Sequence, residues 1–224
     1  MARTSQSKPS SKAKANSKAK RRAGTLAAQF KITLQEIDPP VWRRIRVPAY
    51  YSFWDLHVAI QDAMGWTDSH LHAFRLTHPK VGARVEIGIP DEEFDTGNPV
   101  LPGWEVPLAA YFEKPGFRAE YEYDFGDSWV HEVLLEEVVD PMPGQVFPQC
   151  LGGAGACPPE DCGGPPGYEQ LLIALADPSH EEHESMMEWV GGRFDPTAFA
   201  PSHVTFDDPE ERWIFAFGTK TKNR

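Results

Sequence analysis

The chain has 224 residues and a formal net charge of −11, but the charge is divided unevenly. Residues 1–24 hold eight Lys and Arg and no acid, which leaves 14 basic against 33 acidic residues in the remainder. Such an acidic body repels phosphate backbones, which excludes nucleic-acid binding over most of its surface. No apolar run is long enough to span a bilayer and no secretory segment is visible, so we expect a cytoplasmic protein without membrane contact.

The first 24 residues are rich in Lys, Ser and Ala and offer almost no apolar side chains to bury. We therefore predict a disordered basic tail ahead of one domain over residues 25–224. Nucleic acid or another polyanion is expected to bind through this tail only, and a solvated leader without a function is the alternative. The candidate polyanion-binding residues are Lys18, Lys20, Arg21 and Arg22.

Alternating apolar residues predict two strands, over residues 26–37 and 41–47. A helix then opens at Ser52, with Asp55 completing a capping box, and ends at Gly65. His57 and Gln61 lie off the apolar stripe of this helix, so we expect them at the surface.

Residues 70–76 read as another strand, with His70 and His72 on the same face. A His-x-His pair on a strand can supply two ligands to one metal ion. The alternative is two histidines hydrogen-bonded at the end of a sheet.

Residues 121–132 form the clearest hairpin in the sequence. Alternation favours the register in which Tyr123 lies beside Trp129 and Tyr121 beside His131. The turn is then 125–127, and Gly126 or Asp127 suits a left-handed conformation at its end. His131 is expected on the packed face, among aromatic rings.

Residues 141–168 hold seven Pro, seven Gly and all three cysteines, Cys150, Cys157 and Cys162. We expect a long segment without secondary structure, a kind that is often functional. The spacing is not the Cys-x2-Cys of strong zinc sites, and buried thiols are favoured over a nucleophile or a metal site. Two helices should follow, one from Tyr168 to its end at Asp177-Pro178 and one over residues 180–190.

Several stretches together resemble the plasmid pRiA4b Orf-3-like family. The resemblance implies a single α+β domain, a mostly antiparallel sheet packed by helices, and no established activity. Members of the family are often named after plasmids and transposons. The matching stretches include 39–45, Ser52-Phe53, 63–66, His70 to His72, 123–129 with His131, 156–164, Gly167-Tyr168 and Phe194-Asp195-Pro196.

Two hypotheses of function follow. The first is a non-enzymatic binding or accessory protein, associated with plasmids or transposable elements and acting on an unidentified protein partner, since no phosphate loop, dinucleotide fingerprint or nucleophile elbow is visible. The alternative is a zinc-dependent hydrolase with its site between the 121–132 hairpin and the 150–164 Cys loop. No cofactor is established. The candidate site residues are Asp124, Asp127, His131 and Asp161, and the candidate metal ligands are His70, His72, Cys157 and Cys162.

Overall fold

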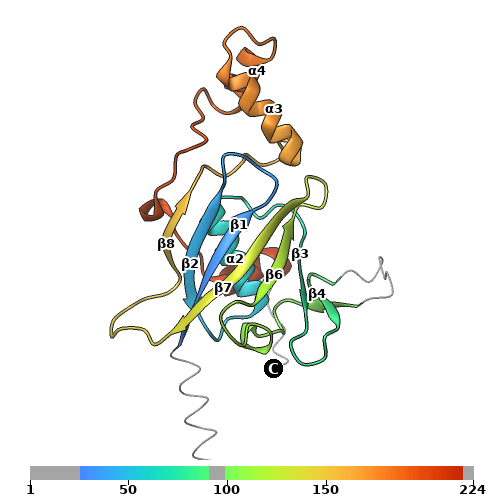
Figure 1. Ribbon diagram of the computed structural model, residues 1–224, viewed down its shortest axis with the longest axis vertical. Helices are drawn as coiled ribbons and strands as arrows, with labels where there is room; N and C mark the ends of the chain where they lie inside the picture. The colour runs from blue at the N-terminus through green and yellow to red at the C-terminus, as the bar shows by residue number, and fades with distance from the viewer. Residues whose placement is uncertain (1–25, 91–98, 219–224) are drawn as a thin grey trace, which may run out of the picture.

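The computed structural model describes residues 26–90 and 99–218, so the predicted basic tail, with Lys18, Lys20, Arg21 and Arg22, lies outside it. Within those residues one eight-stranded sheet runs in the order β5-β4-β3-β6-β7-β1-β2-β8 (Figure 1). All neighbouring strands are antiparallel except β4 and β5. The strands are β1 (Ala27–Leu34), β2 (Trp42–Pro48), β3 (His72–Thr77), β4 (Arg84–Gly88), β5 (Val100–Pro102), β6 (Arg118–Tyr123), β7 (Trp129–Val139) and β8 (Gln149–Ala154).

Helices cover one face and one end of this sheet, which confirms the predicted α+β class. Figure 1 shows α2 and the C-terminal helix behind the sheet, and α3 and α4 beyond its end. None of the helices in the described residues is both long and apolar enough to cross a bilayer. The helical elements are α2 (Phe53–Met64), η1 (Leu108–Ala110), α3 (Gly164–Ala176), α4 (His183–Trp189), η2 (Pro201–His203) and α5 (Pro209–Phe217).

The inner face of the sheet carries the core, and α2 packs on it. The predicted capping box is present: Asp55 N–H donates to the Ser52 hydroxyl, and the Asp55 carboxylate accepts from Ser52 N–H. The helix ends at Gly65 in a left-handed conformation, φ 96°. Its residue Phe53 packs edge-on against Phe74 of β3, inside a core rich in aromatic rings.

The prediction that His57 and Gln61 lie at the surface is wrong, because both are fully buried. Both side chains turn toward the sheet, because the covered face of α2 is wider than its apolar stripe and reaches Tyr121 of β6. Both side chains find a polar partner in the core. The Tyr121 hydroxyl lies 2.8 Å from His57 Nδ1 and accepts a hydrogen bond from Gln61 Nε2 at 2.9 Å.

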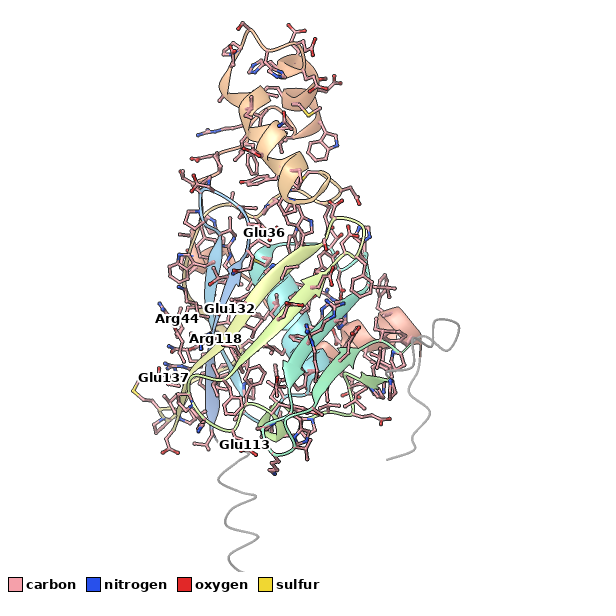
Figure 2. The ribbon with its side chains drawn as sticks, turned by 45° about the vertical axis from the view of Figure 1, so that its right-hand side comes forward. Glu36, Arg44, Glu113, Arg118, Glu132 and Glu137 are labelled. Carbon is pink, nitrogen blue, oxygen red and sulfur yellow. The ribbon has the colours of Figure 1, made fainter. Side chains whose placement is uncertain are left out.

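The outer face of the sheet is charged and pairs its charges across strands. Arg44 of β2 binds both carboxylate oxygens of Glu136 on β7, at 2.7 and 2.8 Å. Arg118 of β6 pairs with Glu132 of β7 at 3.0 Å. Figure 2 shows Arg44, Arg118, Glu132 and Glu137 on the side turned away from α2. This face is therefore compensated locally rather than dominated by one sign of charge.

Arg43 points the other way and is 1 % exposed. Its guanidinium donates to three carbonyls, those of Ala63 (2.8 Å), Trp42 (2.9 Å) and Ala154 (3.0 Å), and lies over the ring of Phe199. Burial lowers the pKa of this guanidinium. The residue joins the end of α2 to the β2–β8 pair, because a cation in the core needs several acceptors to replace water.

The β6–β7 hairpin has the predicted register, with Tyr123 opposite Trp129 and Tyr121 opposite His131. The conformation of its turn differs from the prediction. The left-handed residues are Asp124 (φ 56°) and Ser128 (φ 57°), one at each end of the turn, and not Gly126 or Asp127. Asp124 tolerates this conformation because its side chain accepts hydrogen bonds from the N–H groups of Gly126 and Asp127.

Residues 141–168 contain more regular structure than predicted. Residues 149–154 form β8, which pairs with β2, and α3 already begins at Gly164. An edge strand needs only one partner, so the glycines of β8 do not prevent its pairing. The second predicted helix is shorter than expected, because residues 180–182 form a turn closed by the hydrogen bond from His183 N–H to the His180 carbonyl.

Candidate functional site

Three connections meet at one end of the sheet. They are residues 67–71, which lead into β3, the 124–128 turn between β6 and β7, and residues 157–163, which lead into α3. Backbone hydrogen bonds join the first two, since Asp124 N–H donates to the Leu71 carbonyl at 2.9 Å. Trp66, the residue directly before the first connection, donates from Nε1 to the Pro158 carbonyl at 3.0 Å and so holds the third connection beside the first.

These connections bring together one imidazole and three carboxylates, which we call the loop cluster: His70, Asp124, Glu160 and Asp161. Nε2 of His70 lies 3.1 Å from Asp161 Oδ1, 3.6 Å from Asp124 Oδ2 and 3.8 Å from Glu160 Oε2. Among the described residues, His70, Asp124 and Asp161 form the group whose potential metal-ligating atoms all lie within 4.8 Å of one another. The cluster is accessible, with His70 30 % and Asp161 72 % exposed in their side chains.

These separations can be compared with those of bound metals. Two ligand atoms about 2.1 Å from one tetrahedral ion lie roughly 3.4 Å apart, and neighbouring ligands of an octahedral ion roughly 3.0 Å apart. The distances from His70 to its three acidic neighbours fall around these values. One nitrogen and two or three oxygens suit zinc or manganese, so the donor set fits a divalent cation.

Glu160 was not among the residues singled out from the sequence, and the structure holds it firmly. Its Oε1 accepts from Thr67 N–H at 2.7 Å, from the Thr67 hydroxyl at 3.0 Å and from the Tyr123 hydroxyl at 3.2 Å. Burial raises the pKa of Tyr123, so this hydroxyl stays a donor at neutral pH. The one signal in the sequence is that Glu160 precedes Asp161 in a proline-stiffened loop.

Asp124 and Asp161 share a backbone feature with Asp68, the residue two positions before His70. All three have left-handed backbones, with φ of 56°, 58° and 59°. Aspartate is among the few residues that adopt this conformation readily, so part of the reason for aspartate at these positions is local geometry.

Asp127 lies beside the loop cluster but has a structural role. Its Oδ2 accepts from Gly163 N–H at 3.1 Å, and its carbonyl lies against Gly164, where a Cβ would come within 2.3 Å of the oxygen. Gly164 has φ 68°. The start of α3 therefore sits directly on the hairpin turn, in a space that only glycine fits.

The structure does not bring His72 to the same site as His70. β3 begins only at His72, so the two residues do not share a strand face. His72 is 3 % exposed and its ring stacks on that of His57, with centroids 3.4 Å apart. Burial, and then the neighbouring His57, hold the pKa of His72 well below its ordinary value. It is a neutral core residue.

His131 is also in the core, as predicted, and is not in the loop cluster. Its Nδ1 lies 3.0 Å from the Trp129 carbonyl and 3.2 Å from that of Tyr121, while its Nε2 has no partner in the described part of the chain. Burial lowers the pKa of His131 to about 4. The ring is therefore neutral over the physiological range.

The thiols of Cys157 and Cys162 pack against the core outside the loop cluster. Burial raises the pKa of both, that of Cys162 to about 12, so both are protonated at neutral pH. All three cysteines are free. Protonated, packed thiols are poor nucleophiles and poor metal ligands, in keeping with the buried thiols favoured from the sequence.

Comparisons with known proteins agree with this architecture. The family described as plasmid pRiA4b ORF-3-like protein matches residues 26–203. The uncharacterized protein y4hQ of Sinorhizobium fredii is 39 % identical over 197 residues, which is 86 % of this chain and 97 % of that protein. The crystal structure of MM3350, a protein of unknown function from Methanosarcina mazei Go1, is similar with a TM-score of 0.74 and 40 % identity. That similarity covers 81 % of this chain and 98 % of MM3350.

Proposed function

The chain belongs to the plasmid pRiA4b ORF-3-like family, and since the relatives named above carry no stated activity, we propose a function from the loop cluster itself. The protein binds one divalent cation through His70, Asp124 and Asp161 and acts as a metal-dependent hydrolase. The observation that carries this proposal is the convergence of an accessible imidazole with carboxylates from two other connections, with His70 Nε2 3.1 and 3.6 Å from them and all three potential ligand atoms within 4.8 Å of one another.

A divalent cation held by three protein ligands supplies an activated water, because positions in its coordination shell stay open. The side chains around it have separable tasks. His70, Asp124 and Asp161 hold the ion. Glu160 is fixed by Thr67 and Tyr123, with Oε2 facing His70, and is placed to accept a proton.

The test is the metal content of chelator-free protein and its affinity for zinc and manganese, measured by calorimetry. We expect about one ion per chain in the wild type and none in His70→Ala or Asp161→Asn. Cys157→Ser should keep the ion, because its thiol lies outside the cluster, and the exposed His203→Ala is the matched histidine control. Wild-type protein that takes up neither metal would overturn the proposal, and uptake without turnover of phosphoester, ester or amide substrates would reduce it to a cation-binding protein.

The uneven charge supports a second candidate, a cytoplasmic accessory protein of plasmids or transposable elements that binds nucleic acid through residues 1–24 and contacts a protein partner. Those residues hold eight Lys and Arg and no acid. The family description names a plasmid, and three free thiols agree with a reducing compartment.

Deleting residues 1–24 should abolish nucleic-acid binding and leave the domain folded, as measured by fluorescence anisotropy and thermal melting. Replacing Lys18, Lys20, Arg21 and Arg22 with Ser should lower the slope of log K against log salt by up to about 0.9 for each charge removed. Binding that survives the deletion would contradict this candidate.

A further inference from the structure

The C-terminal helix α5 lies beyond residues 26–203, the part of the chain that matches the family. It packs against α2 behind the sheet (Figure 1). Trp54 of α2 donates from Nε1 to the Pro209 carbonyl at 3.0 Å, and the ring of Trp213 stands edge-on to that of Trp54. The helix is thus docked on the core rather than trailing from it.

Arg212 of α5 is the centre of a sheltered ion network. It binds Asp62 of α2 at 2.8 Å and Asp68 at 3.2 Å, and it also pairs with Asp207. The side chains of Asp62 and Asp68 are 7 % and 10 % exposed. Two carboxylates this poorly exposed need a cation, because a buried charge without a partner strongly destabilises the folded state.

Asp68 is held from two sides. Arg212 binds Oδ2, and His57 Nε2 donates to Oδ1 at 2.8 Å. These contacts fix a residue whose backbone is left-handed, φ 59°.

The anchored residue directly precedes the loop cluster. Ser69 N–H donates to the Tyr123 hydroxyl at 3.0 Å, and His70 follows. Thr67 and Ser69, the two neighbours of Asp68, contact Glu160 and Tyr123, whereas Asp68 itself contacts Arg212 of α5. Residues 67–69 are therefore tied both to the loop cluster and to α5.

We propose that Arg212 is a positioning residue for His70: through Asp68 it fixes the 67–70 backbone, and so α5 controls how tightly the loop cluster holds its cation. This inference rests on the proposed cation site. It gives α5 a role that the family-matched residues do not supply, since removal of the helix would leave Asp62 and Asp68 without their arginine.

The experiment combines two measurements on the full chain with Arg212→Leu, Arg212→Lys and Ile32→Ala. Ile32→Ala removes core volume in β1 and is the control for lost stability. The first measurement is hydrogen exchange of residues 67–71 in metal-free protein. The second is zinc affinity, by competition with a chelating dye.

Arg212→Leu should speed exchange in residues 67–71 selectively and weaken zinc binding about 10- to 100-fold, the usual effect of losing support for a metal ligand. Arg212→Lys should recover part of the slow exchange and part of the zinc affinity. An ammonium group keeps one charged contact, but it cannot contact Asp62 and Asp68 through two separate nitrogens as the guanidinium does. Ile32→Ala should lower the melting temperature without a selective effect on either measurement.

If residues 67–71 of Arg212→Leu exchange at the same rate as in the wild type, the positioning role is refuted, whatever the zinc affinity of the variant. Selective loosening of that segment with unchanged zinc affinity would overturn the control over the cation. If the wild type binds no zinc or manganese, the proposed function fails, and the exchange measurement still decides whether Arg212 holds the loop.

Discussion

Replacing His131 with Phe should make the protein more resistant to acid relative to the wild type. Burial lowers the pKa of this ring from its ordinary value of 6.5 to about 4. Between those values the unfolded chain binds a proton that the folded chain excludes, so the wild type loses free energy of unfolding as the pH falls through that window. A pKa difference of about 2.5 at about 1.4 kcal/mol for each unit gives roughly 3.5 kcal/mol.

A phenylalanine ring can still pack against Trp66 as the His131 ring does. It has no nitrogen to interact with the carbonyls of Tyr121 and Trp129, so that polar contact is lost. The loss of this contact is independent of pH, so it shifts the free energy of unfolding by the same amount at every pH. The quantity to measure is the difference in free energy of unfolding between the two proteins, from urea titrations at several values between about pH 7 and pH 4. His72 and the carboxylates are present in both proteins, so their contributions cancel in this difference. A difference that stays constant with pH would refute the reasoning.

Other predictions concern packing. Trp129→Ala should lower the free energy of unfolding by about 3 to 5 kcal/mol, because the ring is 1 % exposed; a loss below about 1 kcal/mol in urea denaturation would contradict its core position. Gly164→Ala should destabilise clearly, since its Cβ would meet the Asp127 carbonyl at 2.3 Å and its φ is 68°. Gly126→Ala, whose Cβ would meet only the Asp124 carboxylate at 3.2 Å, should cost less, and equal melting temperatures for these two variants would contradict the packing of α3 on the turn.

Local patterns predicted the parts of the fold that depend on neighbouring residues. The register of the β6–β7 hairpin follows from alternation, since the two-residue loop would set Asp124 beside Trp129 and mix charge into the apolar face. The capping box at Ser52 and the stop at Gly65 are likewise local. His57 was misplaced because the apolar periodicity of a helix does not show that a polar side chain beside the stripe has a polar partner in the core, here the Tyr121 hydroxyl of β6.

The loop cluster was predictable only in part. His70, Asp124 and Asp161 were all named from the sequence, but His70 was paired with His72 on the assumption that the strand starts at residue 70. The left-handed backbone of Asp68 and the late start of β3 separate the two imidazoles. Glu160 and Arg212 lie 90 and more residues from Thr67 and Asp68, their partners, and no periodicity reports contacts over that separation.

The charged outer face of the sheet affects how readily two copies of the protein can associate. A wide sheet face that no helix of the described residues covers is a surface on which a second sheet could stack, and stacking would require the pairs Arg44–Glu136 and Arg118–Glu132 to give up their water. Because the charges of these two pairs already have partners within the molecule, a neighbouring copy would have to replace those ion pairs rather than add to them. We therefore expect this face to disfavour stacking of a second copy, less strongly at high salt.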